Sequence, residues 1–241
     1  MSVAVIQARF SSQRLPGKVL APLGESTVLG WTIRAAFAAG EVEAVVVATS
    51  TQPEDDAVAA AARDHGAHVV RGPLDDVLAR YVIAARQFPA SSYVRLTADC
   101  PLLDPKIIDL CSGLMRVDPG LDLISNAIVR THPRGLDVEV IGSSALVRVD
   151  KAATGHHRVH VTTWMTDHPD EFRIVGVVGP LDAGDLRVTI DAPEDLEVVR
   201  VIVRELGEGP FKAADLTAWL RANPATVARN AHVEQKRDED G

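Results

Sequence analysis

The sequence predicts an α/β protein with a doubly wound, mostly parallel sheet. Short apolar runs rich in β-branched residues alternate with segments of helical periodicity through about the first 100 residues. Aromatic residues make up only 4% of the chain, and alanine, valine and leucine dominate, which is typical of strands covered on both faces by helices. This alternation favours parallel neighbours joined by right-handed crossovers.

The first half is expected to hold four strands and three helices. The strands lie at 3–6, in the region 40–50 with 45–47 at its centre, at 68–70 and at 93–96. The helices lie at 27–39, 53–64 and 75–87. The second helix begins with Pro53 and three acids, and both residue types are favourable in a first turn.

The second half is less regular but shows no repeat and no low-complexity linker. We expect helices at 104–117, 143–151, 156–167, 193–206 and 213–222, and strands at 121–124, 137–141, 172–178 and 186–190. Residues 1–225 therefore form a single domain, in which 121–185 is an inserted acceptor and dimerisation portion. The polar residues 226–241 are predicted to be a disordered tail.

Composition excludes several classes of protein. The net charge of −8 and pI near 5.5 argue against a protein that holds long nucleic acids. Two cysteines are too few for a disulfide framework or a cysteine zinc site. The chain contains no uninterrupted run of about 18 apolar residues, so no membrane span is expected. A cytoplasmic location is the default.

The connection after the first strand carries a concentrated positive charge. Arg9, Arg14 and Lys18 fall within ten residues, and a Pro16-Gly17 turn directly precedes Lys18. Ligands of open α/β sheets bind at the carboxyl ends of strands, and cations there suit a polyphosphate. The loop matches neither GxxxxGK[ST] nor GxGxxG, and a plain surface loop is the alternative.

Two aspartates follow later strands. Asp99 ends the strand at 93–96, and Asp191 follows the strand at 186–190. A carboxylate at either place could hold Mg²⁺ against phosphate oxygens. Asp191 also has a structural alternative, because an Asp before Ala192-Pro193-Glu194 is a good helix cap with a capping-box glutamate.

Six segments resemble, in order, the cytidylyltransferases that activate sugar acids. They are QARFSSQRLPGKVL, VVVATSTQPEDD, RGPLDDVLARY, VRLTADCPLLDP, RGLDVEV and TIDAPEDLEVV. The family includes the CMP-KDO and CMP-sialic acid synthetases, and the spore-coat polysaccharide biosynthesis protein F-like branch is the most similar. The resemblance implies a Rossmann-like fold of the nucleotide-diphospho-sugar transferase type, CTP as donor, Mg²⁺ as cofactor and a homodimer.

The resemblance also implies roles for residues. Arg9, Arg14 and Lys18 match the cations that bind the triphosphate, and Asp99 and Asp191 match the metal-binding acids. Arg14, Lys18, Asp99 and Asp191 are thus the expected catalytic residues. Small residues at Ala8, Thr97 and Ala98 are expected beside cytosine, where a tight pocket rejects a purine by size.

Departures from the family pattern point to the acceptor. In His156-His157-Arg158-Val159-His160, the valine stands where relatives often carry glutamate. Together with the turn that holds Arg134 and Asp137, this segment predicts a cationic acceptor site, which favours a compact phosphonate over a sugar acid. The alternatives are a solvated helix start and, less favoured, a zinc site made of His156, His157 and His160.

Two other functions stay open. A glycosyltransferase that uses a nucleotide sugar shares the fold, but it would normally carry an Asp-X-Asp pair where this chain has Thr97-Ala98-Asp99. A non-catalytic nucleotide-binding protein is the third possibility, and the joint presence of four catalytic candidates argues against it.

Overall fold

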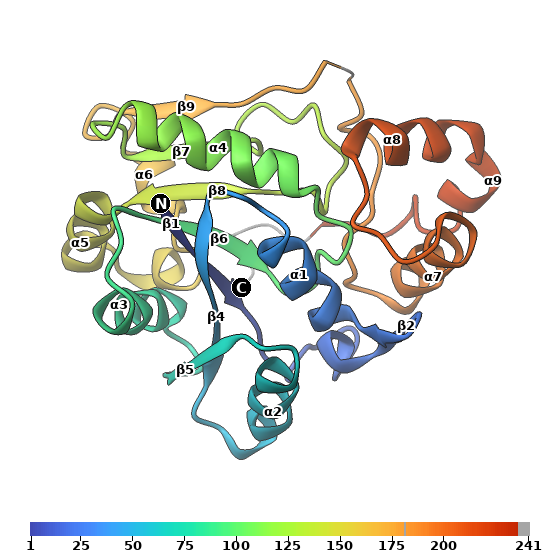
Figure 1. Ribbon diagram of the computed structural model, residues 1–241, viewed down its shortest axis with the longest axis horizontal. Helices are drawn as coiled ribbons and strands as arrows, with labels where there is room; N and C mark the ends of the chain where they lie inside the picture. Colours follow the sequence, from blue (N-terminus) through green and yellow to red (C-terminus); the bar gives the residue numbers. More distant parts are fainter. Residues whose placement is uncertain (181, 236–241) are drawn as a thin grey trace.

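A seven-stranded sheet with helices on both faces forms the centre of the molecule (Figure 1). The structure is a computed structural model that describes residues 1–180 and 182–235. The strand order is β5-β4-β1-β6-β8-β7-β9. The strands of this sheet are β1 (Ser2–Gln7), β4 (Val42–Ser50), β5 (His68–Gly72), β6 (Ser92–Thr97), β7 (Leu123–Ser125), β8 (Glu139–Gly142) and β9 (Ile174–Gly176).

Parallel pairing dominates this sheet, as the sequence predicts. β1 is parallel to both β4 and β6, and β4 is parallel to β5. β8 runs antiparallel to β6 and β7, while β7 and β9 are parallel. A small hairpin of β2 (Pro22–Leu23) and β3 (Ser26–Thr27) lies within the long first connection. The carboxyl ends of β1, β4 and β6 consequently meet at one edge.

Alternating side chains of the strands divide the core into two apolar layers. In β1, Ala4 and Ile6 belong to one layer, whereas Val3 and Val5 belong to the other. The first layer packs under α1 (Val28–Phe37), α2 (Asp56–Asp64), α4 (Pro105–Val117), α7 (Pro193–Leu206) and α8 (Ala213–Ala222). The second layer packs under α3 (Val77–Gln87), α5 (Ser143–Ala152) and α6 (Thr163–Asp167).

Two elements differ from the sequence prediction. Residues 186–190 make a single bridge, from Arg187 to Arg134, instead of a strand. The reason is that their backbone groups bond to two separate places: Val188 N–H donates to the Arg134 carbonyl at 2.7 Å, and Ile190 N–H donates to the Asp99 carbonyl at 2.9 Å.

The predicted helix at 156–167 is interrupted. A 3₁₀ turn, η3 (Gly155–Arg158), precedes α6, and Val161 between them has a φ of 38°. A left-handed backbone at a β-branched residue is incompatible with a continuous helix.

The structure describes residues 226–235 of the predicted tail. After the short helix α9 (Pro224–Val227), Asn230 is buried and its Nδ2 donates to Asp195 Oδ1 at 2.9 Å. A polar side chain thus anchors the part of the tail that sequence composition could not distinguish from disorder. The remaining residues of the prediction, 236–241, lie outside the described residues.

None of the described helices is both long enough and apolar enough to cross a membrane.

The backbone of Gly135 crosses close to that of Val188 and Thr189, so a side chain at this position should destabilise the fold. Gly135 has a φ of 106°, and a Cβ there would lie 2.7 Å from the Val188 carbonyl carbon and closer still to the Thr189 amide nitrogen. Gly66 is the matched control, because its φ is 81° and a Cβ there would meet nothing within 4 Å. Gly135→Ala should cost about 1–3 kcal/mol more than Gly66→Ala in urea unfolding. Equal costs would show that the crossing tolerates a side chain.

Candidate active site

A pocket of about 570 Å³ opens at the edge where the parallel strands end. Gln7 at the end of β1 and Thr97 at the end of β6 lie in its wall. Seven arginine or lysine side chains and four acids line it: Arg9, Arg14, Lys18, Arg80, Arg95, Arg130 and Arg134, with Asp99, Asp137, Glu139 and Asp191. A chain of net charge −8 therefore gathers positive charge in this one pocket, which suits an anionic ligand.

The loop after β1 is held in place by a buried carboxylate. Asp55 accepts from the Phe10 N–H at 2.6 Å and from the Ser50 N–H at 3.1 Å. Farther along, the Gly17 N–H donates to the Phe10 carbonyl at 2.9 Å, and a φ of 72° at Gly17 turns the chain into the short helix η1 (Lys18–Leu20). These contacts fix the backbone from which Lys18 enters the pocket.

The Lys18 ammonium lies between the two predicted metal-binding acids. Its Nζ donates to Asp99 Oδ2 at 2.6 Å, to Asp191 Oδ1 at 2.8 Å and to the Ile190 carbonyl at 2.8 Å. Burial by itself would lower the pKa of Lys18, but the two carboxylates outweigh burial and raise that pKa. Lys18 is therefore a permanent cation.

Asp191 is surrounded by cations. Besides Lys18, Arg187 donates to Asp191 Oδ2 at 2.8 Å, and Arg14 lies 3.2 Å from the same oxygen. Burial works to raise the pKa of this carboxyl, yet Lys18, Arg187 and Arg14 together lower it to about 2. The group stays ionised under all physiological conditions.

The helix cap predicted for Asp191 and Glu194 belongs to a different acid. The carboxylate of Asp195 accepts from the N–H groups of Asp191 and Ala192 at 2.9 and 3.0 Å. Asp195 is fully buried and also binds Arg187. Asp191 is thereby freed from capping and can face the pocket.

The two carboxylates form a donor set that fits a divalent metal ion. Asp99 Oδ2 and Asp191 Oδ1 converge on one point, which Lys18 Nζ occupies. Hard carboxylate oxygens are the ligands that Mg²⁺ prefers. Asp99 and Asp191 are thus the residues of this pocket that could hold such an ion.

The three residues predicted beside the base also lie in the pocket. Ala8 and Ala98 are buried, and the Ala98 N–H donates to the Gln7 carbonyl at 3.1 Å. Thr97 is the last residue of β6, directly before Ala98, and it also lines the pocket. Cys100 adjoins this group, but burial raises the pKa of its thiol, so Cys100 is not an activated nucleophile.

The part of the pocket around Arg134 contains two ion pairs and a guanidinium that has no acidic partner among the described residues. Arg130 holds Asp137 through two hydrogen bonds of 2.6 and 3.1 Å, and Arg95 pairs with Glu139. Among the described residues, no carboxylate lies within 4.0 Å of Arg134. Arg134 lies next to the crossing at Gly135.

The predicted cluster at 156–160 is divided by the structure. His160 lines the pocket, whereas His156, His157 and Arg158 are absent from its wall. Arg158 is engaged by Asp76 at 2.6 Å and Asp150 at 3.0 Å, which ties η3 to α3 and α5. Its guanidinium is a structural cross-link between elements.

Sequence reasoning missed four arginines. One of them is Arg95, which lines the pocket and pairs with Glu139. Arg187 and Arg130 are bound to acids of the site, and Arg80 is buried beneath the first loop, with Nη1 3.3 Å from the Ala48 carbonyl. Arg187 carried a signal, because a charge within a predicted buried strand needs a partner. Arg80 and Arg130 depend on contacts between separate elements.

Comparison with known proteins gives consistent results. Residues 3–116 match the family model described as cytidylyltransferase. The spore coat polysaccharide biosynthesis protein SpsF of Bacillus subtilis is 32% identical over 237 residues, which cover 94% of this chain and 97% of that protein.

Solved structures extend the likeness to three dimensions. A cytidylyltransferase from Leptospira borgpetersenii superposes with a TM-score of 0.91 and is 31% identical, covering 98% of this chain and 99% of its own. CMP:2-keto-3-deoxy-manno-octonic acid synthetase complexed with CTP has a TM-score of 0.66 at 19% identity, covering 85% and 99%. Rv0371c of Mycobacterium tuberculosis, solved with manganese, has a TM-score of 0.58 at 20% identity, covering 83% and 99%. The last two share the fold.

The charge cluster predicts how Asp191 titrates. Its pKa in the folded chain is lowered from the model-compound value of 3.8 to about 2, so its stabilising effect is present above the ordinary pKa and is lost as the pH falls through about 2. Lys18→Met should raise the pKa of Asp191, as measured by ¹³C NMR of its carboxyl carbon. Arg200→Met removes one positive charge outside the pocket wall and should leave that pKa unchanged. An unaltered pKa in Lys18→Met would contradict the assigned pairing.

Proposed function

This chain belongs to the cytidylyltransferase family, and from that premise we propose that it transfers CMP from CTP to a small anionic acceptor and releases pyrophosphate. The observation that carries the proposal is the convergence of Arg14, Lys18, Asp99 and Asp191 in one cationic pocket. These residues are far apart in the sequence: Arg14 and Asp191, which form an ion pair in the pocket, are 177 residues apart.

The reaction joins two negatively charged molecules. An ionised acceptor oxygen forms a bond to the α-phosphorus of CTP; where this oxygen belongs to a hydroxyl group, its proton passes to water. The bond from that phosphorus to the bridging oxygen breaks, and its electron pair leaves with pyrophosphate. Catalysis of such a displacement consists mainly of positioning and charge neutralisation. The proposal accordingly assigns no covalent role to a protein side chain.

The loop after β1 supplies the cations for the triphosphate. Arg9 is exposed at the pocket, while Arg14 and Lys18 are already oriented by Asp191 and Asp99. Cations held in advance spend little free energy on ordering when charge builds up on the leaving group. We assign all three cations to the triphosphate, with Arg14 and Lys18 stabilising the pyrophosphate as it leaves.

A divalent metal ion, with Mg²⁺ preferred, is part of the proposal. Asp99 and Asp191 would hold it, and when bound it would neutralise charge on the α-phosphate. In the structure the same two carboxylates bind Lys18, whose three hydrogen bonds keep its ammonium within the pocket. The base is assigned to the small residues Ala8, Thr97 and Ala98.

A hydroxylated sugar acid is the acceptor class that the geometry favours. The preference for a compact phosphonate rested on a cationic cluster of Arg134, His156, His157, Arg158 and His160. Three of its members, His156, His157 and Arg158, lie outside the pocket wall. Asp137 and Glu139 do line it, and their carboxylates can accept hydrogen bonds from hydroxyl groups. Arg134 supplies a cation for the acid group in either case, so a phosphonate is the second candidate.

A homodimer completes the proposal. Ile128, Val129 and Val178 belong to the 121–185 portion, and they are 44%, 55% and 58% exposed. Apolar side chains grouped at a surface are typical of an interaction site. We assign the subunit interface to this portion.

The activity can be tested by pyrophosphate release. The purified chain is incubated with Mg²⁺, each of the four ribonucleoside triphosphates and a panel of sugar acids and small phosphonates. We expect release that depends on both CTP and an acceptor. Asp99→Asn should lower turnover at least about 100-fold, because the site loses a charge that binds metal and Lys18.

Asp185→Asn is the matched control for Asp99→Asn. Asp185 is paired with the exposed Arg221 and does not line the pocket, so this variant should retain normal turnover. The proposal would be overturned if none of the four triphosphates gave pyrophosphate release, or if Asp99→Asn kept full activity.

Variants of two arginines distinguish a residue that binds the acceptor from one that stabilises the fold. Arg134→Gln should raise the acceptor KM about tenfold or more, since a hydrogen bond to a charged group is lost, with a smaller effect on the KM for CTP. Arg158→Ala should instead lower the melting temperature and leave the acceptor KM near its normal value, because Arg158 bonds Asp76 and Asp150. The reverse pattern in steady-state kinetics would restore Arg158 to the acceptor site.

A further inference from the structure

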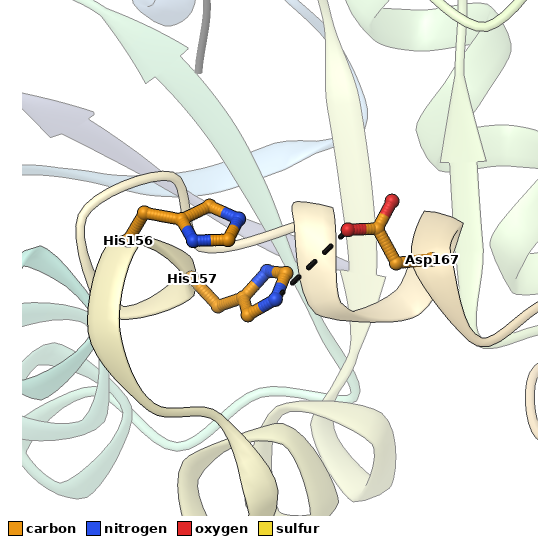
Figure 2. A group of neighbouring side chains, drawn as sticks. All are labelled: His156, His157 and Asp167. Atoms are coloured by element: carbon orange, nitrogen blue, oxygen red, sulfur yellow. Dashed lines mark ion pairs between the residues drawn. The ribbon is translucent and has the colours of Figure 1, made fainter. Parts of the chain in front are cut away.

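Three side chains with metal-ligating atoms lie together on the segment that follows α5. His156 and His157 project from η3, and Asp167 stands at the end of α6 with its carboxylate directed toward His157 (Figure 2). One ligand atom from each of the three lies within 4.8 Å of the others. The zinc triad expected from sequence contained His160, but the structure assembles Asp167 with the two histidines instead.

We propose that His156, His157 and Asp167 bind a divalent transition-metal ion of the zinc class. Two imidazoles and a carboxylate are a ligand set that zinc and cobalt favour. Three protein ligands leave a further coordination position for water. The spread of the ligand atoms is small enough for side-chain rotation to close the set, since Asp167 is more than half exposed.

The hydroxyl of Thr163 already orients the ring of His157. Its Nδ1 lies 2.9 Å from the Thr163 hydroxyl, which directs Nε2 toward Asp167 Oδ2 at 3.9 Å. Metal-bound histidines usually have their other ring nitrogen fixed by such a partner.

This site is separate from the carboxylate pair of the pocket. Asp99 and Asp191 line the pocket, and none of the three proposed ligands does. The two sites also differ in chemistry, because paired carboxylates suit Mg²⁺ whereas imidazole suits zinc, cobalt, nickel or copper. A metal bound at one site therefore need not replace the metal at the other.

The proposed ion would stabilise the part of the pocket wall that residues 160–166 form. His160, Thr162, Thr163 and Thr166 all line the pocket, and they lie between the ligands His157 and Asp167 in the chain. The same stretch contains Val161, whose φ of 38° is strained for a β-branched residue. A metal joining both ends of this short stretch would oppose relaxation of the strained backbone.

Cobalt provides a direct test on the full chain, prepared without a histidine tag. Addition of Co²⁺ alone should produce a visible d–d absorption band and quench the fluorescence of Trp164, whose ring centroid lies 5.2 Å from that of His157. Zn²⁺ should displace the cobalt and reverse both signals. Trp164→Phe should abolish most of the quenching but keep the absorption band.

Variants identify the ligands. Asp167→Ala and His156→Ala should weaken cobalt binding at least about tenfold, the loss expected even for an outer-shell partner. Asp170→Ala is the matched control, since Asp170 is an exposed acid of the same segment outside the cluster, and it should bind normally. Circular dichroism checks that each variant is folded.

Two results would overturn the site. One is the absence of a cobalt band and of quenching in the unmodified chain. The other is equal cobalt affinity in Asp167→Ala and Asp170→Ala, which would place the ion elsewhere. Neither measurement involves CTP or pyrophosphate, so failure here leaves the proposed transferase activity to its own test.

Discussion

An ammonium group buried between two carboxylates is the contact on which the rest of the site depends. Lys18 comes from the loop after β1, Asp99 follows β6 and Asp191 precedes α7, so one contact joins segments 81 and 173 residues apart. Removing charges from water costs several kcal/mol per ion unless each finds partners. Here Lys18 has three acceptors, and Asp191 is balanced by Arg187 and Arg14. The loop, the sheet edge and the last helices are consequently held in one arrangement before any ligand binds.

A second layer of polar contacts supports that arrangement from behind. The fully buried Asp195 accepts from the backbone of Asp191 and Ala192, from Arg187 and from Asn230. One carboxylate thus begins α7, orients the arginine that faces Asp191 and anchors the chain beyond α9. Continuing from Asn230, the Glu234 carbonyl accepts from Arg14 and Gln235 accepts from Arg187. The C-terminal segment is therefore part of the wall of the site.

The sequence predicted those features that depend on local pattern and failed where distant segments share a contact. The alternation of apolar runs and helices in residues 1–100 predicted four parallel strands, and the structure confirms them. Arg9, Arg14, Lys18, Asp99 and Asp191 could be predicted to share one site because the three cations lie in the connection after the first strand and each aspartate follows a later predicted strand. The pairing of Arg158 with Asp76 was not predictable, because its partner is 82 residues away and both charges look solvated in the sequence. The same holds for Asn230, which reads as part of a polar tail until Asp195 is placed beside it.

The paired and unpaired cations of the pocket divide its work. Lys18, Arg14, Arg95 and Arg130 are bound to acids of the same pocket, so their charge is largely cancelled while their geometry is fixed. Within residues 1–180 and 182–235, three pocket cations have no carboxylate in ion-pair range: Arg9 on the loop after β1, Arg134 at the Gly135 crossing, and the buried Arg80, whose guanidinium faces the Ala48 carbonyl. Because Arg80 is buried, net attraction for an anion comes mainly from the more accessible Arg9 and Arg134, whereas the paired groups set its orientation. A pocket built this way recognises two separate acidic groups, as a reaction between a nucleoside triphosphate and an acid requires.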